Sequence, residues 1–206
     1  MSSASLLRWR TTRRDELDEI VTVHVSVGGT RHGRRYATQQ INHAYVMLLS
    51  LQFQGFCRDL YSESVKAIVA PVASTPFAVV MRAELLRGTK LGTGNPKPGN
   101  IGADFGRIGI NFWVQVVADS RRSQRRQAKL EALNRWRNAI SHQDFDLNNL
   151  YPLRLFPISR YPTRPTATEV QLTQIRDWRE ACNGLAESFD RVLSAYITNI
   201  TGSVPW

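Results

Sequence analysis

Residues 41–60, INHAYVMLLSLQFQGFCRDL, are the stretch that decides the fold. Their apolar side chains recur every three or four residues, which is the period of an α-helix. These side chains are Ile41, Tyr45, Leu48, Leu49, Phe53, Phe56 and Leu60. Between residues 44 and 56 apolar side chains cover nearly the whole circumference, which is typical of a buried helix. We therefore predict a long central helix from about Tyr36 to Val69, ended by Pro71 and Pro76.

Further helices are predicted downstream of this central helix. Residues 76–87 start with a proline, which suits the first position of a helix. Residues 105–117 are apolar and are interpreted as a short helix or an irregular packing segment. Residues 120–141 form an amphipathic helix. A long C-terminal helix begins at the capping box Thr168-Glu169-Val170-Gln171 and carries one apolar stripe as far as Ile200.

The N-terminal segments are less regular. In residues 15–27, valines alternate with polar residues from Val21 onward, which indicates a strand. The acids of residues 15–19 follow two threonines, which instead indicates the first turn of a helix. We favour the helix because the elements predicted downstream are helical. Residues 1–10 are expected to form a loose arm.

The predicted helices form one domain, an all-α bundle spanning residues 1–206 without internal repeats. Residues 150–167 contain four prolines, and we interpret them as an extended connector inside this domain. The glycine-rich run of residues 92–99 is interpreted as a simple loop. It is not a phosphate-binding loop, because its glycine spacing is wrong and its prolines lack the N–H groups that bind phosphate.

The chain carries 27 basic and 17 acidic residues, which gives a net charge of +10. Nearly all of the basic residues are arginines, whose forked guanidinium matches phosphate better than a lysine does. A high genomic GC content also enriches arginine and is an equal explanation of this bias. The net positive field exists in either case and favours polyanionic partners.

The two cysteines, Cys57 and Cys182, are too few for a disulfide framework or a zinc site and suit a reducing compartment. No stretch reaches the roughly 18 apolar residues that a membrane span requires. The N-terminal residues lack an apolar core of signal-peptide length. We therefore expect a cytoplasmic protein that has no membrane partner.

The candidate chemistry lies at the end of the helix predicted over residues 120–141. Residues 137–142, RNAISH, place Arg137 and His142 five positions apart, and we call them the Arg-His motif. At about 100° per residue, Arg137 projects onto an apolar stripe, where a cation is costly unless it is paired or opens into a polar cavity. That stripe consists of Leu130, Leu133, Trp136 and Ile140. Arg137 then either extends its charged end to solvent or pairs with a carboxylate such as Asp59, or it is held by packing and directed at a phosphate.

On one ideal helix, side chains five residues apart point about 140° away from each other. Arg137 and His142 of one chain share a cleft only if the helix ends or distorts near Ser141. The alternative is a two-fold partner that brings two copies of the Arg-His motif face to face.

Four arginines lie upstream on the same predicted helix: Arg121, Arg122, Arg125 and Arg126. We call them the basic ridge. By itself such a run is usually a solvated charged face. Together with the Arg-His motif it is typical of a surface that binds a nucleic-acid backbone.

The sequence RNAISH resembles the R-x4-6-H motif of HEPN (higher eukaryotes and prokaryotes nucleotide-binding) domains. The polar Asn138 after the arginine is the form typical of HEPN ribonucleases. The resemblance extends to the chain from Gly33 to Leu60, to residues 95–113 and to the last helix, and it is closest to bacterial proteins of the RiboL-PSP type. Two positions depart from the pattern. Gln54 and Arg58 stand where acids are frequent, although Asp59 is kept, and Asp144 replaces the tyrosine of toxins silenced by nucleotidylation.

The resemblance implies a homodimer whose two motifs line one cleft, and an endoribonuclease that needs no metal or cofactor. RNA supplies the 2′-OH nucleophile. His142 would transfer the proton, Arg137 would stabilise charge on phosphorus, and Asn138 would orient His142 or the phosphate. Asp59 and Ser141 are candidate supporting residues. No His, Asp and Glu cluster in the sequence suggests a metal site.

Such an enzyme would leave 2′,3′-cyclic phosphate and 5′-OH ends. It would act as a toxin or an antiphage-defence effector, with a cognate antitoxin or another defence-system protein as its partner. Two alternatives stay open. One is a non-catalytic HEPN module that binds RNA or a nucleotide, and the other is a helical interaction domain.

Overall fold

A computed structural model describes residues 1–28, 36–145, 150 and 170–206 of the chain. Every regular element within these ranges is a helix, which confirms the predicted all-α class. The predicted connector, residues 150–167, lies outside the described residues except for Leu150. Thr168 and Glu169 of the predicted capping box also lie outside them.

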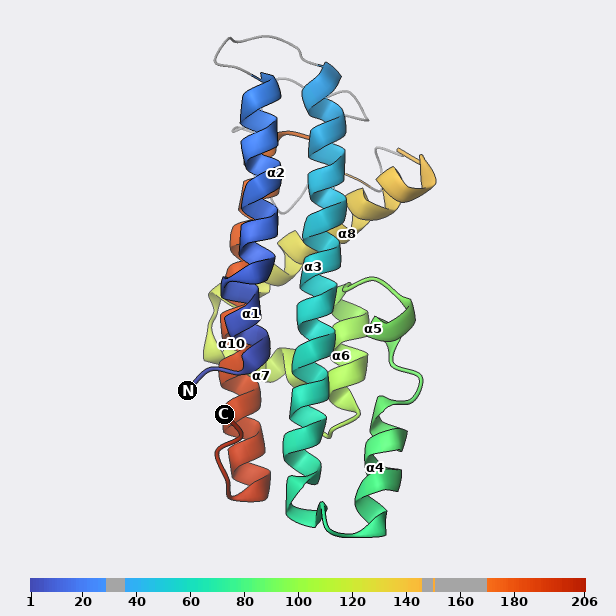
Figure 1. The fold of residues 1–206 in the computed structure, drawn as a ribbon, viewed down its shortest axis with the longest axis vertical. Coiled ribbons are helices and arrows are strands. Elements are labelled where there is room, and N and C mark those ends of the chain that lie inside the picture. Colours follow the sequence, from blue (N-terminus) through green and yellow to red (C-terminus); the bar gives the residue numbers. More distant parts are fainter. Residues whose placement is uncertain (29–35, 146–149, 151–169) are drawn as a thin grey trace.

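Helix α3 (Tyr36–Val69) runs along the centre of the molecule, and the other helices pack around it (Figure 1). Most of its apolar side chains from Tyr45 onward are buried, although Leu51 is exposed, and this burial confirms the predicted central helix. The most deeply buried of them are Tyr45, Val46, Leu49, Phe53, Phe56, Cys57, Leu60 and Val65. The helix ends at Val69 in the short 3-10 turn η1 (Ala70–Val72), because Pro71 cannot continue the hydrogen-bond ladder.

Helix α1 (Ala4–Arg10) occupies most of the segment expected to be a loose arm, so that prediction is wrong. The hydroxyl of Ser3 caps the helix by accepting a hydrogen bond from the Leu6 amide at 3.0 Å. Leu6 and Trp9, three residues apart, are buried, and the Trp9 ring packs edge-on against Phe53 at 5.6 Å. The burial of these two side chains against α3 fixes the segment.

Helix α2 (Thr12–Gly28) continues from α1 beside the upper part of α3, which confirms the helical interpretation of residues 15–27 (Figure 1). Leu17 is buried, and Ile20 and Val21 pack partly against the same core. These residues have helical spacing, so a helix buries them on one face. The alternating Val23, Val25 and Val27 are about half exposed, since no neighbouring strand exists among the described residues to bury them.

Helix α4 (Pro76–Leu86) runs beside the lower part of α3 and agrees with the prediction (Figure 1). Pro76 occupies its first turn, where no N–H donor is needed. Ala78 is its only fully buried residue, and Phe77, Val79 and Val80 are exposed.

One further prediction needs correction between α4 and α8. The glycine-rich run is not one loop, because α5 (Lys90–Thr93) and α6 (Pro98–Gly106) leave only residues 94–97 outside a helix. The buried Asp104 carboxylate accepts hydrogen bonds from the Lys90 and Leu91 amides at 2.7 Å each, and so satisfies the start of α5. Residues 105–117, predicted as a short helix or an irregular packing segment, contain the end of α6, a turn and most of the short helix α7 (Phe112–Asp119). They cross from α6 to α7 through a turn at Gly109, whose φ of 89° favours glycine.

Helices α8 (Arg122–His142) and α10 (Leu172–Thr201) pack against each other. Contacts from Ser123 to Ser188 and from Lys129 to Asp177 join them. The long C-terminal helix is confirmed, but its predicted start at the capping box is wrong. Gln171 has extended backbone angles, φ −91° and ψ 147°, and the first helical residue is Leu172.

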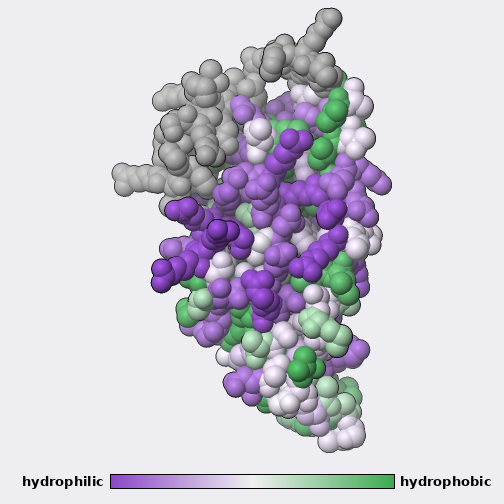
Figure 2. Space-filling model, turned by 90° about the vertical axis from the view of Figure 1, so that its left-hand side faces the viewer, coloured by the Kyte–Doolittle hydropathy of each residue, from purple (hydrophilic) through white to green (hydrophobic). Residues whose placement is uncertain are grey.

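The surface has two kinds of region. Figure 2 shows hydrophilic side chains gathered across the middle of one face, whereas the lower end is mostly apolar or neutral. Ile200 and Val204 are exposed at the end of α10. In the part of the chain that the structure describes, no helix combines the length and hydropathy needed to cross a bilayer.

Candidate functional site

The C-terminal half of α8 places the Arg-His motif on a firmly packed helix. Leu130, Leu133, Trp136 and Ile140 are all buried, which confirms the predicted apolar stripe. The Trp136 ring lies 6.4 Å from that of Trp178 on α10. Arg137 follows directly and is half-buried, while Asn138, Ser141 and His142 are exposed. A fixed backbone therefore presents the polar side chains of the motif.

Arg137 differs from the other half-buried cations among the described residues. Four of those cations pair with a carboxylate, and Arg126 donates to the backbone carbonyl of Gly184. The four are Arg13, Lys129, Arg135 and Arg179. In the described part of the chain Arg137 has no ion pair, and its guanidinium donates only to Oδ1 of Asn138, at 3.2 Å. A partly desolvated charge without a counter-charge is poorly compensated, so it favours an incoming anion.

Asp59 is not the counter-charge of Arg137. Its Oδ2 accepts hydrogen bonds from Arg8 at 2.7 Å and from Arg13 at 2.9 Å. The alternative in which Asp59 pairs with Arg137 is therefore not realised. As a candidate supporting residue, Asp59 is placed beside α1 and α2, where it ties both helices to α3.

Asn95 is a site residue that the sequence reasoning missed. It lies in the connection between α5 and α6, and its Nδ2 donates to the same Oδ1 of Asn138 that accepts from Arg137. Three side chains from two separate segments thus share one hydrogen-bonded network. The only sequence signal was the inclusion of Asn95 in the resemblance, since periodicity says nothing about which loop crosses a helix.

The structure does not bring His142 beside Arg137 within one chain. Helix α8 continues through His142 and ends at Gln143, which has the left-handed φ of 55° and donates its N–H to the Ala139 carbonyl. The predicted helix end is present, but it comes one residue too late to turn His142. Both side chains project from a continuous helix, about 140° apart by ideal geometry. Ser141 lies between them, exposed, near the end of the same helix.

The basic ridge divides into two parts. Arg121, Arg122 and Arg125 are exposed at the start of α8, whereas Arg126 is half-buried against α10. The Arg126 guanidinium donates to the Gly184 carbonyl at 3.2 Å and lies so close that a Cβ at position 184 would overlap it. By ideal helix geometry Arg126 is the ridge residue nearest in direction to Arg137, about 20° away. The ridge arginine that shares the direction of Arg137 is thus packed against α10, and the exposed ridge arginines point in other directions. The ridge and the motif therefore do not form one continuous exposed face.

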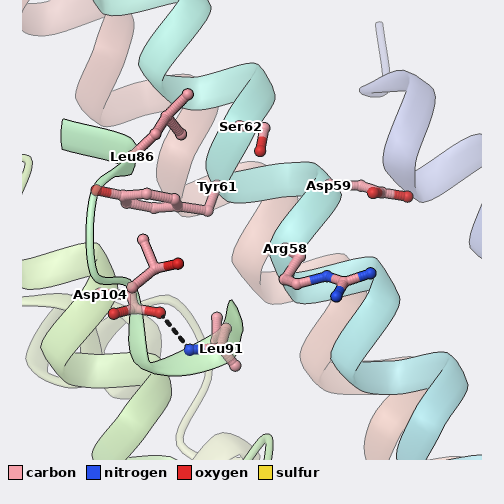
Figure 3. Close-up of a pocket in the computed structure, with 8 residues that line it drawn as sticks. Arg58, Asp59, Tyr61, Ser62, Leu86, Leu91 and Asp104 are labelled. Carbon is pink, nitrogen blue, oxygen red and sulfur yellow. Dashed lines mark hydrogen bonds between the residues drawn. The ribbon is translucent and has the colours of Figure 1, made fainter. Parts of the chain in front are cut away.

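A pocket of about 290 Å³ lies between α3, the end of α4 and the α5–α6 region (Figure 3). Asp59 and Asp104 both line it, and each carboxylate already accepts two hydrogen bonds. In Figure 3 the Arg58 side chain points away from Asp104 and Tyr61. No residue of the Arg-His motif lines this pocket, so it is separate from the candidate site.

The remaining reactive groups are buried or dispersed. Cys57 and Cys182 are free thiols in the core, and burial raises the pKa of each well above its ordinary value, so neither suits a nucleophilic role. Within the described ranges, no group of three or more His, Cys, Asp or Glu side chains could hold a metal ion.

Comparison with protein-family models, with curated proteins and with solved structures finds no match to this chain.

Proposed function

We propose that this chain is a metal-independent endoribonuclease of HEPN type, in which Arg137, Asn138 and His142 act on the scissile phosphodiester. Its fold would be a HEPN-like bundle that works as a two-fold dimer. It would serve as a toxin or an antiphage effector whose activity a partner protein restrains. The single observation that carries the proposal is the half-buried Arg137, which has an amide neighbour but no carboxylate among the described residues.

The residues supply what this reaction needs. Attack by the 2′-OH on phosphorus builds negative charge on the phosphoryl oxygens, and a preorganised guanidinium stabilises that charge. His142 would take the 2′-OH proton or protonate the leaving 5′-oxygen, since an imidazole can act either as a general base or as a general acid. The products are a 2′,3′-cyclic phosphate and a 5′-OH, and no metal ion takes part in either step.

The start of α8 supports RNA as the substrate. Arg121, Arg122 and Arg125 crowd cations at the helix end where the macrodipole is positive, and the first turn contains no acid. This arrangement is unfavourable for the isolated helix, but it suits a bound phosphate backbone, which meets both the guanidinium groups and the dipole. The net charge of +10 acts in the same direction over the whole surface.

The continuous helix at the motif makes a second copy part of the proposal. Because Arg137 and His142 of one chain diverge, a complete site would combine Arg137 of one copy with His142 of the other. An equal mixture of Arg137→Ala and His142→Ala proteins tests this directly. Half of the dimers would be mixed and each would hold one intact site, so activity should return to about a quarter of the wild-type value. A mixture that stays inactive contradicts the shared site.

The main test is RNA cleavage in EDTA by wild type, Arg137→Ala, His142→Ala and Asn138→Ala. We expect the first two variants to lose at least about a hundredfold in kcat, with folding retained. Arg82→Ala is the control, because Arg82 is an exposed arginine on α4 without an ion pair among the described residues. Substrate with 2′-O-methyl groups should stay intact. Undiminished cleavage by either motif variant, or a requirement for magnesium, would refute the proposal.

A second candidate is a non-catalytic module that binds RNA through the same residues. The divergence of Arg137 and His142 on one helix favours it, since binding needs the arginine and the exposed ridge but not a nearby general base. This alternative predicts salt-sensitive RNA binding that survives His142→Ala, together with no cleavage by wild type. Binding and cleavage assays on the same protein preparation therefore separate the two functions.

A further inference from the structure

Asn138 is held from two sides. Its Oδ1 accepts one hydrogen bond from Arg137 and another from Nδ2 of Asn95. An amide oxygen has two lone pairs, so these two donors occupy it fully. The Nδ2 of Asn138 consequently faces away from both neighbours and stays available to donate to a bound group.

The bond between Arg137 and Asn138 needs this outside support. Adjacent residues on a helix do not face each other, so the long arginine side chain must bend toward its neighbour and lose rotamer freedom. An exposed asparagine could otherwise rotate away into solvent. The donor from Asn95 removes that freedom, because Oδ1 must point toward the α5–α6 connection to receive it.

The α5–α6 connection is itself anchored, so Asn95 is a firm support. The Asn95 carbonyl accepts a hydrogen bond from Asn100 at 2.8 Å. Pro96 is buried, and its carbonyl accepts a hydrogen bond from Nδ2 of the buried Asn134 at 3.2 Å. Asn134 lies one turn before Asn138 on α8, so the connection is fixed to the same helix face that carries Asn138. Trp113 adds a hydrogen bond to the Pro98 carbonyl at 2.8 Å.

We infer that Asn95 is a positioning residue of the candidate site: it fixes Asn138, and Asn138 in turn fixes the Arg137 guanidinium before the anion arrives. This inference rests on the proposed function for its effect on catalysis. Asn95 does not need to touch RNA. Its contribution is preorganisation, because a guanidinium that is already oriented loses less freedom when the charged transition state forms.

Kinetics with saturating RNA test the catalytic consequence. Asn95→Ala should lower kcat by about 10- to 100-fold and change KM by less than about threefold, since orientation rather than binding is lost. Thr93→Ala is the matched control, because Thr93 is exposed at the end of α5 and has no side-chain hydrogen bond in the described structure. The double variant Asn95→Ala/Asn138→Ala should be no slower than Asn138→Ala alone. The inference would be overturned if the kcat losses of the two single variants multiplied in the double variant, or if Asn95→Ala left kcat unchanged.

A second measurement keeps this inference separate from the proposed function. NMR relaxation of the Arg137 Nε–Hε group reports the order of the guanidinium in the free protein. We expect an ordered signal in wild type and Thr93→Ala, and a mobile one in Asn95→Ala and Asn138→Ala. If wild type fails to cleave RNA but this pattern holds, the proposed function fails and the positioning role stands. If Arg137 stays equally ordered in Asn95→Ala, the positioning role fails whatever the cleavage result.

Discussion

The two halves of helix α8 use arginine in opposite ways. Near the start of the helix, the half-buried Arg126 donates a hydrogen bond to the Gly184 carbonyl and packs α8 against α10. Arg125, one position earlier, is exposed to solvent. Near the end, Trp136 is completely buried and Arg137 beside it lacks a carboxylate in the described part of the chain. Neighbouring residues thus differ in whether their side chains pack against another helix, and residue type alone does not show which of them does.

The largest contrast is expected between Trp136 and Arg137. Trp136→Ala should lower the free energy of unfolding by about 3–5 kcal/mol, because it leaves a cavity against Trp178 in the core. Arg137→Ala should change it by less than about 0.5 kcal/mol, since no ion pair is lost. Urea denaturation of the two variants measures both values. A strongly destabilised Arg137→Ala protein would show that the arginine is a structural residue.

A smaller contrast separates Arg126 from Arg125. Arg126→Ala should cost about 1–2 kcal/mol of stability through the lost hydrogen bond and packing, whereas Arg125→Ala should cost less than about 0.5 kcal/mol. RNA binding should respond in the reverse order. Arg125→Ala should reduce the slope of log K against log salt by about 0.7, and Arg126→Ala should leave the slope unchanged. If Arg125→Ala leaves the slope at the wild-type value, the exposed part of the ridge lies outside the RNA contact.

The smallest effect concerns Asp119, which ends α7 just before the ridge. Hydrogen bonds from Arg191 lower the pKa of this carboxyl below its ordinary value of 3.8. A carboxyl whose pKa is lowered by folding stabilises the folded protein at pH values above the ordinary pKa of that carboxyl. This stabilisation disappears as the pH falls through the lowered pKa. Asp119→Asn should therefore cost less than about 1 kcal/mol at neutral pH and nothing in strong acid.

Thermal denaturation of wild type and Asp119→Asn over a series of acidic pH values measures this difference. Glu180→Gln is the control, because Glu180 is exposed on α10 and makes no ion pair among the described residues. A difference between wild type and Asp119→Asn that persists unchanged into strong acid would mean that the ion pair with Arg191 contributes nothing.

Local patterns predicted the elements that bury one continuous stripe. The central helix α3 and the apolar face of α8 follow from three-and-four spacing, whereas α4 follows from its N-terminal proline, and each was found within a residue or two. The pattern failed where burial depends on a distant partner. Residues 1–10 are too short for a periodic apolar pattern to stand out, yet burial of Leu6 and Trp9 suffices because α3 offers them a complementary surface. The glycine-rich run overlaps the end of α5 and the start of α6, and neither short helix was predicted. Helix α5 depends on hydrogen bonds to the Asp104 carboxylate, which lies more than ten residues downstream.

For the candidate site, the sequence by itself determined the residue types and their order: an arginine on an apolar stripe, an asparagine after it, a histidine five positions on, and a helix end close by. Tertiary structure alone decided their environment. In the folded chain Asp59 pairs with Arg8 and Arg13, Arg126 packs against α10, and Asn95 donates a hydrogen bond to Asn138. The physical reason is that periodicity fixes the direction of a side chain on its own helix, whereas a counter-charge or a hydrogen-bond partner is chosen by whichever distant segment packs against it.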